Sequence, residues 1–147
     1  MRGQRPYVIV GSIVLMACAA SILARGGEPP SEPSEGPTRL AVVWSSGDPD
    51  VAHRVCLMYT HAAVTQKWFD EVRLVVWGPS ARLLAADKDL QAKIKAMMKD
   101  GVNVQACIVC ADSYGVTPAL RGLDIEVKPM GRPLTDMLQS GYKVLTF

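Results

Sequence analysis

The sequence is poor in the features that mark several common classes of binding site. Only two histidines occur in the 147 residues, aromatic residues make up 6%, and 16 Lys and Arg against 14 Asp and Glu leave a net charge of +2. The basic residues are scattered along the chain, whereas a nucleic-acid groove needs a basic stripe with aromatic faces. We therefore expect no nucleic-acid partner.

Two familiar kinds of catalytic site also lack their parts. The first expected strand is followed by Ser45-Ser46-Gly47-Asp48, which contains one glycine and no lysine and so does not match a phosphate-binding loop. No serine lies in a nucleophile elbow. His53 and His61 fall on one expected helix about 12 Å apart, which is too far to share a metal ion. No organic cofactor is expected.

The first 25 residues carry the clearest targeting signal. Arg2 and Arg5 precede Tyr7–Ala24, a stretch of 18 residues without charge. This pattern is typical of a secretory segment, and its length is also at the short end for a membrane-spanning helix. Three outcomes stay open: retention as an anchor, cleavage after Ala17-Cys18-Ala19, or lipidation of Cys18 in the lipobox-like Leu15-Met16-Ala17-Cys18. Each outcome places the rest of the chain on the extracytoplasmic, periplasmic side.

The remainder divides into a linker, residues 26–38, and one domain, residues 39–147. The linker is rich in Pro, Glu, Ser and Gly, which have little apolar surface to bury. The domain, at about 110 residues, is long enough to bury one hydrophobic core without disulfides.

From Leu40 onward, short apolar runs alternate with helical patterns. The runs predict strands at residues 40–44, 72–77, 102–107, 125–127 and 142–147. Helices are expected from residue 49, at 80–86, at 90–98, from 117 and at 133–140. Because strands that alternate with helices pair in parallel, we expect an α/β fold, a three-layer α/β/α sandwich around a mostly parallel five-stranded sheet.

The first helix of the domain is expected to begin at Pro49 with Asp48 as its N-cap. Helical spacing predicts that its buried face carries Val51, Val55, Met58, Tyr59, Ala62 and Ala63. Cys56 borders this face and is expected to behave as a small core residue.

Cys107 and Cys110 form the candidate reactive site. Cys107 closes the third expected strand, at the carboxyl edge where reactive groups collect in such sheets, and Cys110 follows in a helical turn. A helix N-terminus favours thiolate over thiol, and the thiolate is the nucleophile. Sulfurs three residues apart in a helical turn can approach within bonding distance. The pair can therefore attack a sulfur substrate and then close as a disulfide.

Two other interpretations of this pair stay open. Outside the cytoplasm the cysteines can form a structural disulfide, although so small a loop constrains little of the unfolded chain. The pair can also contribute to a zinc site, which normally needs four ligands. The conceivable set is His53, Cys56, Cys107 and Cys110, and we assign no metal ligand from it.

Four segments of residues 39–147 carry a resemblance to a known family. They are Trp77-Gly78-Pro79-Ser80, residues 101–116 around the two cysteines, Met130-Gly131-Arg132-Pro133-Leu134-Thr135, and residues 141–147. In this order and spacing they resemble the DsrE family of small sulfur-relay proteins, which includes DsrEF-like and TusD-like subunits. The resemblance implies a flavodoxin-like α/β fold and assembly into homo- or hetero-oligomers.

The resemblance also implies a role for Cys107. In relay members a cysteine at the end of strand three carries persulfide sulfur between partner proteins, and that position corresponds to Cys107. Those members are cytoplasmic, whereas this chain carries an export or anchor segment, and a second thiol at Cys110 would attack a persulfide on Cys107. We therefore expect an exported or membrane-anchored protein that transfers sulfane sulfur or exchanges thiols and disulfides through these cysteines.

Its expected partners are a sulfur donor or acceptor protein, or a low-molecular-weight thiol. We also expect the chain to form a homo-oligomer. The alternative is a non-catalytic binding or assembly module with structural cysteines.

Overall fold

The computed structural model describes residues 36–147. The predicted anchor, with its alternatives of cleavage and lipidation at Cys18, lies outside the described residues, as does most of the predicted linker. Within residues 36–147, none of the helices combines the length and the apolar character needed to cross a membrane.

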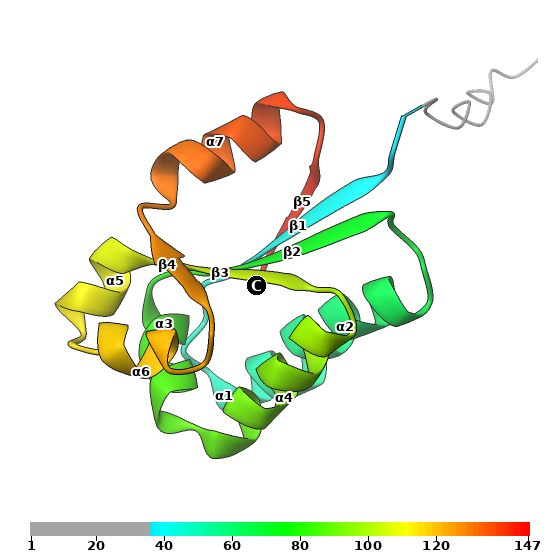
Figure 1. The fold of residues 1–147 in the computed structure, drawn as a ribbon. Coiled ribbons are helices and arrows are strands. Elements are labelled where there is room, and N and C mark those ends of the chain that lie inside the picture. The colour runs from blue at the N-terminus through cyan, green and yellow to red at the C-terminus, as the bar shows by residue number, and fades with distance from the viewer. Residues whose placement is uncertain (1–35) are drawn as a thin grey trace, which may run out of the picture. The chain divides into compact units, whose positions relative to one another are not determined.

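Five strands alternate with helices along the chain (Figure 1). The strands are β1 (Arg39–Trp44), β2 (Glu71–Val76), β3 (Asn103–Cys107), β4 (Glu126–Lys128) and β5 (Lys143–Thr146). The helices are α1 (Pro49–Val51), the π-helix η1 (Ala52–Cys56), α2 (Leu57–Thr65), α3 (Pro79–Ala86), α4 (Lys88–Lys99), α5 (Ile108–Ser113), α6 (Thr117–Arg121) and α7 (Gly131–Gln139). All five predicted strands are present, and none of their ends differs by more than one residue from the sequence expectation.

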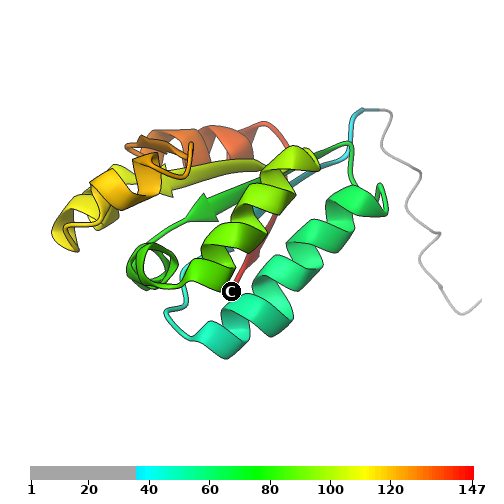
Figure 2. The same ribbon diagram turned by 60° about the horizontal axis from the view of Figure 1, so that its bottom comes forward.

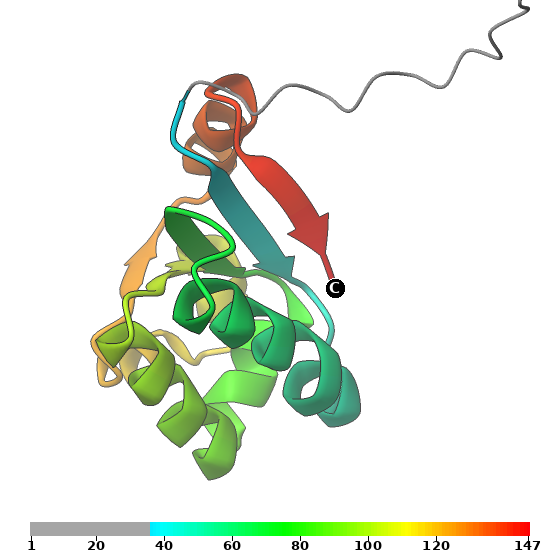
Figure 3. The same ribbon diagram turned by 90° about the vertical axis from the view of Figure 1, so that its right-hand side faces the viewer.

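The strands form one sheet in the order β4-β3-β2-β1-β5, and every neighbouring pair is parallel. The predicted α/β fold is therefore confirmed. β5 returns to the far edge beside β1, so the end of the chain lies next to its first strand (Figure 3).

The direction of the crossovers decides which face each helix covers. From β1 to β4 the chain moves steadily toward one edge of the sheet, and α2 and α4 lie together on one face (Figures 1 and 2). The connection from β4 to β5 runs back across the sheet, and α7 lies on the opposite face (Figure 1). Because parallel crossovers keep one hand, reversing the direction of travel moves the helix to the other side.

Each face of the sheet contributes to its own hydrophobic cluster. On the larger side, alternate residues of β1 such as Leu40, Val42 and Trp44 pack with α2 and α4, where Leu57 and Ile94 are fully buried. The smaller cluster under α7 contains Ala41, Val43, Val75, Cys107, Met130, Met137 and Tyr142. Cys107 therefore belongs to the side of the sheet that α7 covers.

The first helical segment buries a different face from the predicted one. Asp48 caps it as expected, since its carboxylate accepts from the N–H groups of Asp50 at 2.8 Å and Val51 at 3.3 Å. The buried residues, however, are Ala52, Cys56, Leu57, Thr60 and Ala63. Val55 and Met58, predicted to be buried, are 42% and 59% exposed.

The cause of this error is the π-helix η1. The N–H of Leu57 donates to the carbonyl of Ala52, five residues earlier, where an α-helix would use a four-residue spacing. The wider turn holds one extra residue and so rotates the following helix relative to a regular α-helical pattern. Of the predicted face, Ala63 alone is buried among the residues described.

Candidate functional site: two thiols at the carboxyl edge

Cys107 is the last residue of β3 and the N-cap of α5, with φ −73° and ψ 115°. Its side chain is 4% exposed and belongs to the cluster under α7, with Val75 and Met130. The sequence correctly places this sulfur at a strand's carboxyl end, beyond which α5 begins. Its burial means that a reagent meets Cys110, which is half-buried, before it meets Cys107.

Cys110 lies in the six-residue helix α5 and packs against the same cluster, as Trp77 also does. The thiol of Cys107 lies near enough to raise the pKa of the Cys110 thiol, and both cysteines are free. The structure therefore brings the two predicted residues together as neighbouring thiols.

The pKa of Cys110 lies above the ordinary thiol value. Burial is the largest cause, the N–H of Gly78 opposes it, and the hydrogen bond to Cys107 and the charge of its thiolate raise the pKa further. For Cys110, desolvation and the neighbouring Cys107 outweigh the opposing N–H of Gly78. Cys110 is therefore protonated at neutral pH.

The loop between β2 and α3 supplies the backbone group that contacts Cys110. Gly78 has φ 68° and ψ −137°, a combination that a side chain on an L-residue disfavours strongly. Ser80, which is fully buried, holds this loop, since its hydroxyl contacts the carbonyl of Trp44 and accepts the N–H of Trp77 at 3.0 Å. The buried serine thus fixes the turn that aims the Gly78 N–H at the thiol.

Trp77–Ser80 carries part of the family resemblance, and the sequence alone does not place this segment at the site. A signal for it is present in the sequence: a glycine directly after a buried strand, with proline at the first position of the next helix. Neither residue type points to sulfur chemistry, so the link to Cys110 needs the tertiary structure.

Charged and polar side chains lie on the strand beside Cys107. In the parallel register Cys107 pairs with Lys128 and Gln105 with Glu126, so each pair projects from the same face. Glu126 accepts from Gln105 at 2.8 Å and pairs with Lys128 at 2.8 Å. These bonds lower the pKa of Glu126, with Lys128 as the largest cause. The carboxylate thus holds the ammonium group of Lys128 close to the strand that carries Cys107.

The conceivable four-ligand zinc set is not assembled. Cys56 is fully buried in the cluster on the other side of the sheet from Cys107, where burial raises the pKa of its thiol to about 12. His53 lies 3.6 Å from the carboxylate of Asp87. Among residues 36–147, no three His, Cys, Asp or Glu side chains are grouped so that they could hold a metal ion. Cys56 is instead a core residue, as its position in the sequence predicts.

The fold and the paired thiols define a class: a parallel α/β protein with a dithiol at the carboxyl edge of its sheet. The model of the DsrE/DsrF-like family matches residues 38–147, and the chain belongs to this family. Membership supports a protein of the sulfur-relay type in general terms. A search of the curated proteins found no match.

Solved structures with the same fold agree with this assignment. A conserved protein of unknown function from Bacteroides thetaiotaomicron, BT1422, is 30% identical, with a TM-score of 0.71 over 74% of this chain and 94% of that one. The ychN protein from E. coli is 22% identical, with a TM-score of 0.61 over 75% of this chain and all of that one. A protein of unknown function from Methanobacterium thermoautotrophicum, MTH1491, is 17% identical, with a TM-score of 0.58 over 75% and 99%. The last two likenesses concern the fold alone.

Proposed function

We propose that this protein accepts sulfane sulfur on Cys107 and that Cys110 then releases it. The observation that carries the proposal is the contact between the two thiols at the carboxyl edge, beside the Gly78 N–H. Membership in a family of the sulfur-relay type supports the choice of sulfur as the transferred group. The raised pKa of Cys110 supports the division of roles, because a protonated thiol is a weak competitor for the first attack.

The first step is transfer of one sulfur atom. Cys107 is 4% exposed, so the packing around it must open before a donor can reach its sulfur. The thiolate of Cys107 then attacks the outer sulfur of a persulfide donor, R–S–SH, and forms Cys107–S–SH while R–S⁻ leaves. No net oxidation takes place, because one S–S bond is exchanged for another. The donor can be a partner protein or a low-molecular-weight thiol in its persulfide form.

The second step uses Cys110. After losing its proton, Cys110 attacks the inner sulfur of Cys107–S–SH, which gives the Cys107–Cys110 disulfide and HS⁻. The carried sulfur is reduced by two electrons and the two thiols are oxidised by two. An external thiol reductant must then reduce the disulfide before another cycle. Alternatively, an acceptor thiolate attacks the outer sulfur first, and the protein acts as a sulfur carrier.

The proposal includes the location that the N-terminal sequence predicts. Residues 7–24 would anchor the protein, with the domain on the extracytoplasmic side and residues 26–38 as the linker. A homo-oligomer is part of the same proposal, from the family resemblance.

The test measures sulfur loading by mass spectrometry of the intact protein after incubation with glutathione persulfide. Cys107→Ser should abolish loading and Cys110→Ser should prolong it, while Cys56→Ala, which changes the buried cysteine on the other face, should load like the parent. Equal loading of the two site variants and the parent would contradict the assignment. A pair that resists alkylation until the protein unfolds would instead support the alternative, an assembly module with structural cysteines.

A further inference from the structure

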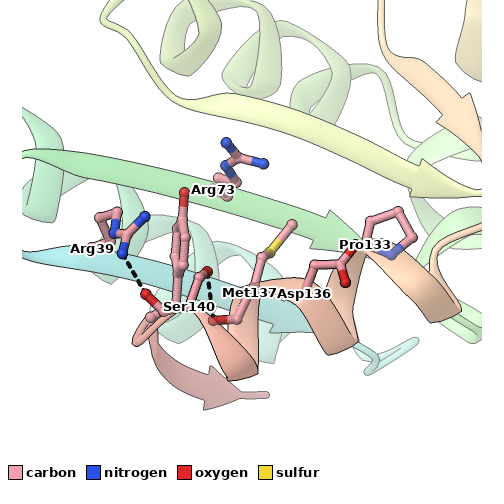
Figure 4. Close-up of a pocket in the computed structure, with 7 residues that line it drawn as sticks. Arg39, Arg73, Pro133, Asp136, Met137 and Ser140 are labelled. Atoms are coloured by element: carbon pink, nitrogen blue, oxygen red, sulfur yellow. Dashed lines mark hydrogen bonds between the residues drawn. The ribbon is translucent and has the colours of Figure 1, made fainter.

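A cavity of about 330 Å³ lies under α7, at the opposite edge of the sheet from the thiols. Arg39, the first residue of β1, and Arg73 of β2 border it from the sheet, and Met137 and Pro133 border it from α7 (Figure 4). Because the strands are parallel, the start of β1 and the end of β3 lie at opposite edges. The cavity is therefore separate from the site of Cys107.

The charges around this cavity do not cancel. Arg73 donates from Nε to Glu71 at 2.6 Å, and the carboxylate of Asp136 accepts from Arg132 at 2.7 Å. The guanidinium of Arg39 donates to the carbonyl of Ser140, and no carboxylate in residues 36–147 lies within ion-pair distance of it. Arg39 is thus the arginine of the lining without an ion-paired carboxylate, although the charge of Glu71 lies near enough to interact with it.

Arg39 also has an unmet hydrogen-bonding group. Its Nε is buried and has no hydrogen-bond partner among the described residues. Burial of a charged group without a partner is unfavourable, so an anion that enters the cavity gains more here than at an exposed arginine.

Tyr142 holds both arginines near the cavity. The guanidinium carbon of Arg39 lies 4.8 Å from the centre of the Tyr142 ring and that of Arg73 lies 5.3 Å from it. Stacking on a ring restricts the orientation of a guanidinium fork, which suits recognition of a planar carboxylate. The remaining lining from Met137 and Pro133 is apolar, so part of the cavity favours a hydrocarbon body.

We propose that this cavity binds a small organic carboxylate, with its charged group at Arg39 and Arg73 and its apolar body against Met137 and Pro133. The cavity volume is at the lower end of the range for small-molecule sites, which limits the ligand to about the size of a single ring. The cavity and the thiols are different places on the domain, and this proposal does not rest on the proposed sulfur chemistry.

Benzoate tests this proposal, with benzamide as its neutral isostere, in isothermal titrations of the full chain. We expect saturable benzoate binding and at least about tenfold weaker benzamide binding, because losing one charge-assisted contact costs about 1.4 kcal/mol. Equal affinity for the two compounds, or no saturation at millimolar benzoate, would overturn the proposal. This comparison needs no variant and so does not depend on whether a variant folds.

Variants then locate the site. Arg39→Gln and Arg73→Gln should each weaken benzoate binding about tenfold or more. Arg54→Gln removes the same charge from an exposed arginine on η1 and should leave binding unchanged. Cys107→Ser should also bind benzoate like the parent. Undiminished binding by folded Arg39→Gln and Arg73→Gln proteins would refute the assignment.

Discussion

Ser80→Ala removes one oxygen atom from the turn that faces Cys110 and leaves the rest of the loop in place. The hydroxyl contacts the carbonyl oxygens of Trp44 and Trp77 and accepts the Trp77 N–H, so it joins the ends of β1 and β2 to the start of α3. The residue is fully buried, and water cannot replace these bonds without entering the core.

The size of the effect follows from which groups lose a partner. The Trp77 N–H also lies 3.0 Å from the Trp44 carbonyl, so these two backbone groups keep each other after the substitution. Neither is left unsatisfied. The cost is therefore that of two net hydrogen bonds, about 2 kcal/mol in the free energy of unfolding, and not that of a buried orphan group.

Urea unfolding followed by tryptophan fluorescence measures this difference, with Ser113→Ala as the control. Ser113 donates its hydroxyl to the Cys110 carbonyl at 2.8 Å in an exposed position, and its loss should change the free energy by less than about 0.5 kcal/mol. If Ser80→Ala costs no more than Ser113→Ala, the turn is not held by this hydroxyl. Loosening the turn should also slow alkylation of Cys110 at fixed pH, because the Gly78 N–H would no longer oppose the rise in its pKa.

Three further predictions concern the turn, the core and the first helix. Gly78→Ala places a side chain on a backbone with φ 68° and ψ −137°, and we expect a loss of about 1–3 kcal/mol in unfolding free energy with slower alkylation of Cys110 by iodoacetamide. Unchanged alkylation would show that this N–H does not affect the thiol. Burial raises the pKa of Cys56 from 9.0 to about 12, so above pH 9 its thiol ionises in the unfolded chain and stays protonated in the folded one. The stability of the parent relative to Cys56→Ala should therefore be constant below pH 9 and fall by about 1.4 kcal/mol per pH unit above it, and a flat difference between pH 8 and 10.5 in chemical unfolding would contradict this sign. Asp48→Ala removes the cap of the first helix and should cost about 1 kcal/mol in thermal unfolding, whereas a loss as large from the exposed Asp50→Ala would argue against a capping role.

The fold follows from the sequence because its strands are buried and parallel. Leu40–Trp44 and Val72–Val76 are nearly continuous apolar runs, which is the pattern of strands that are covered on both faces. The spacing of helices between them then requires parallel pairing. The order of strands in the sheet, with β5 beside β1, does not follow from local pattern, because it depends on which edge accepts the last strand.

The orientation of the first helix could not be predicted, for a specific physical reason. Helical periodicity assumes a constant turn, and the π-turn between Ala52 and Leu57 breaks that assumption after the first few residues. Residues 52–57 contain neither proline nor glycine to mark the change. Polar Thr60 is buried in place of Met58, with its hydroxyl bonded to the carbonyl of Cys56.

The candidate site was predictable in part. The position of Cys107 at a strand end and the spacing to Cys110 are local features, and both are visible in the sequence. The burial of Cys107, the direction of the pKa shift at Cys110 and the contact from Gly78 come from residues far apart in the chain. The cavity at Arg39 is lined by residues from both ends of the domain, so no local sequence motif predicts it.

Helix α7 begins next to Met130, in the cluster that contains Cys107, and ends at Ser140, whose carbonyl contacts Arg39. At about 1.5 Å per residue, this single rod of nine residues reaches about 13 Å across the sheet. A rigid rod of that length cannot tilt at one end without moving at the other. A molecule bound at Arg39 and the side chains packed around the Cys107 sulfur therefore lie against the same helix.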